Sequence, residues 1–247
     1  MKKFCKRIPV LFLCCAMCIT AVSAATSYST WKTTTVEEQG VTYRSRSGID
    51  SSVRGFTTAI TANESAVDEG LVGARAILYY DDGSIATQSR VVYNQSVING
   101  VTATSPMISL SGDYYARGEA HYWVGEEEYE VVVTNKTPTM QLARSVDETL
   151  DPMILEEFAE ELSAVSVNES GETYGAAVLQ DVIDLDLLSA VGINGQRGYI
   201  RAEDMPKAAN SLEEARTVVY EDYYIPLYAE DGVTVIDSCL IGSGFAE

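Results

Sequence analysis

The sequence predicts a mainly β protein with an antiparallel β-sandwich-like N-terminal domain, a linking amphipathic helix and a small α+β C-terminal domain. Residues 26 to about 137 form short segments rich in Thr, Val and Tyr, several of them joined by glycine-containing turns. Near residue 151 the hydrophobic period changes from two to about 3.6 residues, which indicates a helix. Strand-like segments return after residue 166.

The first 24 residues have the composition of a secretory signal peptide. A basic start, Met1–Arg7, precedes an apolar segment that ends in small residues, so we expect cleavage after Ala24, with Ala25 as the second choice. The apolar segment is shorter than the ~20 residues of a permanent membrane span. We therefore expect an extracellular protein, either released or held at the cell surface, with no transmembrane segment in its mature chain.

Residues 26–137 are expected to form the β-sandwich-like domain. Leu71–Tyr80 alternates in period two, and the pattern resumes over Ile85–Tyr93 after Asp81-Asp82-Gly83. Asp-Gly between alternating segments is a strong hairpin signal, because glycine accepts the positive φ of a tight turn. A second hairpin is expected between Tyr114–Val124 and Glu128–Thr134. Further strands are expected at Ser29–Val36, Val41–Ser47, Gly55–Ala62 and Val101–Leu110.

A linking helix is predicted over residues 147–165. Asp151 can cap its first turn, and Pro152 suits the first helical position because its missing N–H is not needed there. Apolar residues follow at helical spacing, with glutamates away from that stripe. The domain boundary is expected just before this helix, near Thr137-Pro138.

Residues 166–247 are predicted to form a small α+β module. Leu187–Val191 and Arg197–Arg201 flank a glycine-containing turn and read as a hairpin. Ser211 and Glu214 have the spacing of a capping box, which predicts a short helix to about Val219. A last hairpin is expected around Asp231-Gly232.

Several strings in this module carry a resemblance to other proteins. They are Val167–Gly175, Gly198–Arg201, Glu213–Ala215, Ile225–Tyr228 and Asp231–Ile236. Together they resemble a C-terminal module of uncharacterised exported proteins of Gram-positive bacteria, over about residues 166–247. That family has no established activity, so the resemblance implies export and assigns no site residue.

The net charge and the small number of histidines and cysteines limit which ligands and metals the protein is expected to bind. The chain has 36 acidic and 17 basic residues, for a net charge of −19, which disfavours nucleic acid and anionic lipid. Solubility explains this charge, and cationic partners or divalent ions would also suit it. His121 is the only histidine, and Cys239 the only cysteine after residue 24, so we expect no zinc site, other metal site or cofactor.

Groups for catalysis are scarce. A Cys239–His121 dyad is the remaining nucleophilic option, although Cys239 lies in an apolar strand, which is typical of a core thiol. Asp184 and Asp186, or the acids of Glu126–Glu128, could pair for glycoside hydrolysis, but we prefer to interpret them as solvated acidic loops. We assign no catalytic residue, which favours a protein without enzymatic activity and leaves an enzyme open.

One strand offers a candidate ligand face. Tyr115, Arg117, His121 and Trp123 alternate along it and share one side, where outward aromatic rings would suit recognition. A cross-strand aromatic ladder that only stabilises the sheet is the other interpretation of these rings, and we prefer it. We expect a secreted or surface-associated, non-catalytic binding or adhesion protein whose partner is an extracellular protein or glycan. A secreted carboxylate-dependent glycoside hydrolase and a small secreted antagonist are the alternatives.

Overall fold

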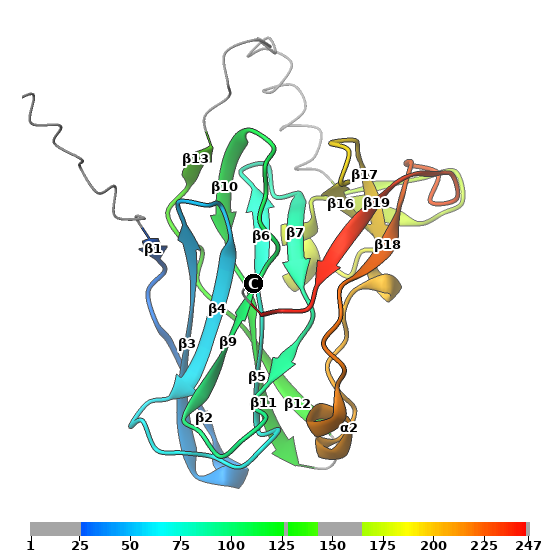
Figure 1. The fold of residues 1–247 in the computed structure, drawn as a ribbon. Helices are drawn as coiled ribbons and strands as arrows, with labels where there is room; N and C mark the ends of the chain where they lie inside the picture. The colour runs from blue at the N-terminus through cyan, green and yellow to red at the C-terminus, as the bar shows by residue number, and fades with distance from the viewer. Residues whose placement is uncertain (1–25, 126–127, 143–164, 246–247) are drawn as a thin grey trace, which may run out of the picture.

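The computed structural model describes residues 26–125, 128–142 and 165–245. The expected cleavage position at Ala24 and Ala25 lies outside these residues, as does the predicted linking helix apart from Val165. Two antiparallel sheets pack around a shared core, and the C-terminal module lies beside the second of them (Figure 1). The prediction of a mainly β fold is confirmed.

The first sheet has five strands in the order β1-β3-β4-β9, with β2 also paired to β3. Tyr43, Ile49 and Ala59 point inward and are fully buried, while alternate positions point outward. β9 ends earlier than the predicted Val101–Leu110, since Pro106 has no N–H for a ladder. The elements are β1 (Thr26–Tyr28), β2 (Lys32–Val36), η1 (Glu37–Gln39), β3 (Val41–Asp50), β4 (Gly55–Thr61) and β9 (Gly100–Thr104).

The second sheet is built from long strands that are each interrupted midway. Its two halves have the matching orders β13-β10-β6-β7 and β12-β11-β5-β8. The predicted hairpin around Asp81-Asp82-Gly83 is confirmed, with Gly83 at φ 85°. At Ala76 the ladder is interrupted, and the Ala76 N–H donates to the Ser89 hydroxyl. The strands are β5 (Val72–Arg75), β6 (Ile77–Tyr80), β7 (Ile85–Ser89), β8 (Val92–Tyr93), β10 (Gly112–Ala116), β11 (Glu119–Gly125), β12 (Glu128–Val133) and β13 (Met140–Leu142).

The central strands of the second sheet are buried on both faces. Every residue of β5, β6, β7 and β8 is buried. Val72 and Ala74 pack in the core shared with the first sheet, whereas Ile77 and Tyr79 pack in the core of the C-terminal module. Period-two alternation identifies which residues share a face, but it does not determine what covers each face.

The C-terminal module contains the predicted hairpins and the predicted short helix. β16 pairs with β17, and β18 with β19, around turns whose Gly195 and Gly232 have positive φ. The Ser211 hydroxyl accepts from the Glu214 N–H at 3.1 Å, so the predicted cap is present. The elements are β14 (Ser166–Val167), β15 (Thr173–Gly175), η2 (Ala177–Asp181), β16 (Leu187–Val191), β17 (Arg197–Arg201), η3 (Ala202–Asp204), α2 (Leu212–Thr217), β18 (Tyr223–Tyr228) and β19 (Val235–Gly242).

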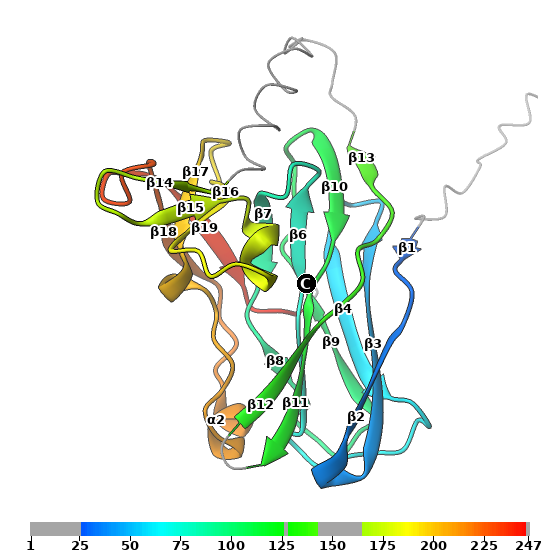
Figure 2. The ribbon, with the colours of Figure 1, turned by 180° about the vertical axis from the view of Figure 1, so that it is seen from behind.

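Strand β7 joins the module to the sandwich. β19 pairs in parallel with one end of β7 and β16 with the other, so these strands close a ring with β17 and β18. The ring encloses a core in which Leu188 and Ile241 pack with Ile85 and Tyr115 of the second sheet. Figure 2 shows the module beside β7. In the same view, α2 lies next to β12 at the bottom of the molecule. The second sheet and the C-terminal module therefore share hydrogen-bonded strands and one hydrophobic cluster.

Candidate functional site

The four residues of the expected ligand face lie where the C-terminal module covers the second sheet. Tyr115 and His121 are each 2% exposed, and Arg117 and Trp123 are half-buried. Tyr115 stacks on Tyr79, with ring centroids 5.3 Å apart, and burial raises its pKa. A large ligand therefore has no access to Tyr115 or His121 in this arrangement.

A polar seam of Arg75, Gln88, Glu119 and His121 lies between the sheet and the module. Arg75, 4% exposed, donates to Gln88 and lies 3.3 Å from the Glu119 carboxylate. Burial alone would raise the pKa of Glu119, but Arg75 and His121 together outweigh it and hold that pKa to about 2. His121 Nε2 lies 3.3 Å from the same carboxylate, and neither ring nitrogen makes a hydrogen bond within the described part of the chain.

The thiol and acid pairs considered for catalysis have other roles in the fold. Cys239 lies in the module core and donates weakly to the Val191 carbonyl, and burial raises its pKa to about 12. Asp186 accepts from the N–H and hydroxyl of Thr173, so it fixes a turn ahead of β16. Asp184 accepts from Gln180 on the solvent side of the same segment.

Asp181 and Glu119 come from distant elements and influence each other. Burial raises the pKa of Asp181, with Glu119 adding to the rise and Arg117 opposing it. Each carboxylate has an arginine partner, Arg117 for Asp181 and Arg75 for Glu119. Opposite pKa directions in two nearby acids fit a general acid and a base, and structural ion pairs produce them as well.

An acidic hollow opens between β2 and β12. It is lined by Glu37, Glu38, Glu128 and Glu130, and all four side chains are exposed to solvent. Neither Glu119 nor Asp181 lines it. Exposed carboxylates around an open hollow do not meet the need of glycoside hydrolysis for an acid held protonated in a sheltered site.

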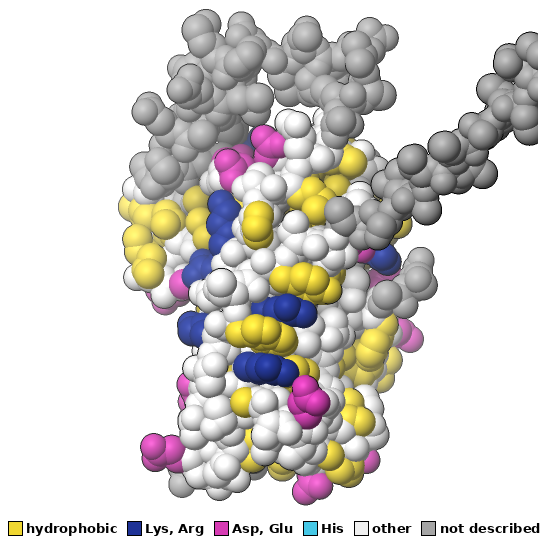
Figure 3. All heavy atoms as spheres, turned by 90° about the vertical axis from the view of Figure 1, so that its left-hand side faces the viewer, with side chains coloured by type: hydrophobic (Ala, Val, Ile, Leu, Met, Phe, Trp, Pro, Cys, Tyr) yellow, Lys and Arg dark blue, Asp and Glu magenta, His cyan; other side chains and the backbone are white. Residues whose placement is uncertain are grey.

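An arginine–aromatic stack crosses the outer face of the first sheet, in the order Phe56, Tyr28, Arg46, Trp31, Arg44. Phe56 meets Tyr28 edge to face, with centroids 5.6 Å apart. The Arg46 guanidinium carbon lies 3.8 Å from the ring centre of Tyr28 and 4.3 Å from that of Trp31. Arg44 covers Trp31 at 4.8 Å. Figure 3 shows this face with a column of alternating hydrophobic and basic side chains.

The local sequence explains the position of each member of the stack. Arg44 and Arg46 alternate along β3 with the buried serines Ser45 and Ser47, so both arginines point outward. Tyr28 pairs with Gly48, where any side chain would overlap the Phe56 ring. The loop that carries Trp31 is anchored where the Ser47 N–H donates to the Ser29 hydroxyl at 3.0 Å.

The two arginines differ in how their charge is balanced. Arg44 Nη2 lies 3.6 Å from the Glu64 carboxylate, whose side chain is 73% exposed. Arg46 has no carboxylate within ion-pair distance among the described residues. In a chain with a net charge of −19, this face therefore carries cationic groups that are only partly neutralised.

Sequence reasoning missed the stack. A signal was present in the alternation of Arg44 and Arg46 along a predicted strand, with Trp31 in the preceding segment. Recognising it requires the registers of β1 and β3 and the course of the loop between β1 and β2, which are long-range information.

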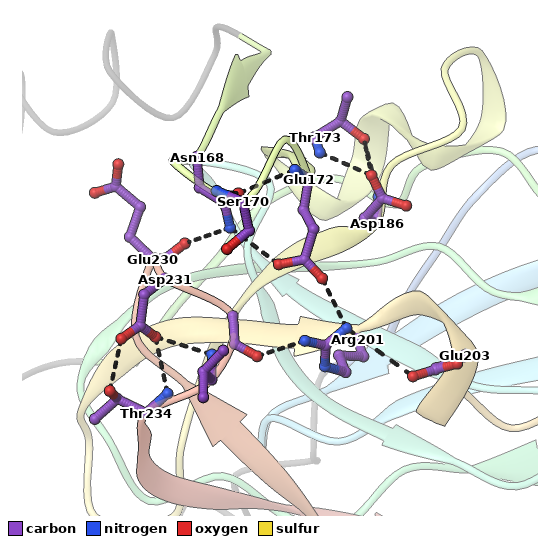
Figure 4. A network of polar contacts seen from close by, with 12 residues as sticks. Asn168, Ser170, Glu172, Thr173, Asp186, Arg201, Glu203, Glu230, Asp231 and Thr234 are labelled. Carbon is purple, nitrogen blue, oxygen red and sulfur yellow. Dashed lines mark hydrogen bonds and ion pairs between the residues drawn. The ribbon is translucent and has the colours of Figure 1, made fainter.

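Three of the five strings that carry the family resemblance meet in one polar network. Glu172 accepts from Asn168 and Arg201, and Arg201 also donates to the Gly232 carbonyl at 2.6 Å. Asp231 accepts from Thr234 and closes the last turn (Figure 4). These contacts tie Val167–Gly175, β17 and the turn before β19 together, which gives these residues a structural role.

No family model, curated protein or solved structure matches this chain. Among the described residues there is no group of three or more His, Cys, Asp or Glu side chains that could hold a metal ion. Helices in that part of the chain are all too short or too polar to span a bilayer.

Proposed function

We propose that this chain is an exported, non-catalytic binding or adhesion protein that uses the outer face of the first sheet to hold an anionic ligand. Export rests on the signal-peptide composition of residues 1–24. Binding rests on the arginine–aromatic stack, and above all on Arg46, whose guanidinium has no carboxylate partner among the described residues.

The geometry of the stack suits ligand binding. Arg46 is held between the rings of Tyr28 and Trp31, so its guanidinium is already oriented before a ligand arrives. Pre-orientation lowers the side-chain entropy lost on binding. The cation–π contacts themselves stabilise the exposed face by only about 0.5–1 kcal/mol each.

A binding screen tests this proposal. The mature chain is labelled and applied to arrays of extracellular glycans and proteins, beside the variants Arg46→Gln and Arg216→Gln. Arg216 is an exposed arginine on α2, so its variant makes the same change in net charge away from the stack. We expect ligands that the wild type and Arg216→Gln bind and Arg46→Gln does not. Equal binding by all three proteins would refute the assignment of this face.

A carboxylate-dependent hydrolase is the second candidate, because Glu119 and Asp181 have pKa values shifted in opposite directions. Their arginine partners and the module that covers the seam argue against turnover there. Hydrolysis of labelled polysaccharides by the wild type, abolished in both Glu119→Gln and Asp181→Asn while Glu203→Gln stays active, would establish the hydrolase and displace the binding proposal.

A further inference from the structure

We infer that the ligand of the first sheet is a polysaccharide that carries carboxylates, a class represented by hexuronate polymers. This inference rests on the proposed function and identifies the ligand class of the same face. It follows from three features of that face: two outward arginines on one strand, rows of threonine hydroxyls beside them, and strands whose backbone groups are already paired.

The arginines supply the charge recognition. Arg44 and Arg46 are two residues apart on β3, which places their backbones about 7 Å apart on one face. Each guanidinium can bind a carboxylate by donating two parallel N–H hydrogen bonds to its oxygens. Two such groups in line suit a polymer that repeats its charge better than a single small anion.

The threonines supply hydroxyl recognition. Arg46 is directly opposite Thr58 on β4, and Arg44 is opposite Thr33 on β2. The Thr58 and Thr102 hydroxyls lie 3.0 Å apart across β4 and β9. Since each hydroxyl has one donor and two acceptor sites, such a pair retains hydrogen-bonding capacity toward solvent. The outward threonines are Thr33, Thr35, Thr42, Thr58, Thr102 and Thr104.

An acidic peptide fits this face less well. Extended peptides bind sheets mainly by pairing with an unpaired strand edge. Arg44 and Arg46 lie on β3, which is paired with β4 on one side and with β1 and β2 on the other. The groups that remain for a ligand are side-chain hydroxyls, guanidinium donors and ring edges, and these match sugar hydroxyls, carboxylates and C–H surfaces.

The net negative charge of the protein does not prevent this binding. The Debye length is about 8 Å at physiological ionic strength, so carboxylates on distant faces are largely screened. Glu64 forms an ion pair with Arg44 of the stack, and it can turn away because its side chain is 73% exposed.

The test uses oligogalacturonate, oligoguluronate and hyaluronan as carboxylated probes, with methyl-esterified oligogalacturonate and polyglutamate as comparison probes. Titration calorimetry is run on wild-type protein, Arg46→Gln, Thr102→Val and the control Arg216→Gln. Thr102→Val keeps the β-branched shape suited to a strand and removes one hydroxyl.

We expect at least one carboxylated glycan to bind and methyl-esterified oligogalacturonate to bind at least tenfold more weakly than that glycan. Arg46→Gln should weaken binding of the glycan about tenfold or more. Thr102→Val should weaken glycan binding without changing the unfolding midpoint, whereas a purely structural role of the threonine would leave affinity unchanged.

The outcomes separate this inference from the proposed function. Binding of polyglutamate and of none of the glycans, lost in Arg46→Gln, would overturn the glycan class and keep the face as a binding surface. No binding of any carboxylated glycan overturns the inference. Glycan binding that is equal in wild type and Arg46→Gln would remove both the inference and the assigned face.

Discussion

Replacing Glu119 by Gln should remove one component of the pH dependence of stability, within a defined pH window. The pKa of Glu119 falls from an ordinary value of 4.5 to about 2 in the folded chain, because Arg75 and His121 outweigh the effect of burial. Each pKa unit corresponds to about 1.4 kcal/mol, so the ionised carboxylate stabilises the fold by about 3 kcal/mol. Because the folded pKa is the lower one, this stabilisation is complete above pH 4.5 and is lost as the pH falls toward 2.

Urea unfolding at a series of pH values measures this effect. The difference in unfolding free energy between wild type and Glu119→Gln should be about 3 kcal/mol near neutral pH and should shrink through the window, since a protonated Glu119 resembles glutamine. Glu203→Gln, whose side chain is 72% exposed, serves as the control and should change stability little at any pH. A difference for Glu119→Gln that is the same at every pH would show that the Arg75–Glu119 pair is not the source of the stabilisation.

Four further predictions follow from burial and packing. Tyr79, whose pKa burial raises, should stay protonated in alkaline solution until the protein unfolds; tyrosinate absorbance that develops while circular dichroism is still native would count against this. Gly48→Ala should lower stability by about 1–3 kcal/mol, because the new methyl group overlaps Phe56; an unchanged denaturation midpoint would contradict the packing. Residues 166–247 expressed alone should lack a cooperative thermal transition, since their core needs apolar residues of the second sheet; a sharp calorimetric transition would show an independent domain. Cys239 should react with thiol reagents only after denaturation, and rapid labelling of native protein would disprove its burial.

Local features of the sequence predicted the hairpins well. Asp81-Asp82-Gly83 and Asp231-Gly232 stand between alternating segments, and both turns join antiparallel strands as expected. Turn chemistry is local, because glycine tolerates the positive φ that other residues resist. The helix expected over 147–165 lies outside the described residues apart from Val165 and stays a prediction.

The pairing of strands that are distant in the sequence could not be predicted from local turn residues. Tyr115 and His121 lie on successive strands, β10 and β11, and both are buried. The sequence does not show that β16 and β19 pair with β7 beside them. The arginine–aromatic stack depends equally on register, since Tyr28 meets Arg46 only when β1 pairs with the far end of β3. Contacts between segments distant in sequence therefore bury the expected ligand face around Tyr115 and His121 and leave the outer face of the first sheet exposed.

Mapping of a bound carboxylated glycan on the folded chain tests the central claim most directly. Backbone amide resonances are assigned, and their shifts are followed as oligogalacturonate is added. The account predicts shifts concentrated in β3, β4 and β9, with Arg44 and Arg46 at their centre. Shifts concentrated in the polar seam or in the C-terminal module, with the first sheet unchanged, would contradict it.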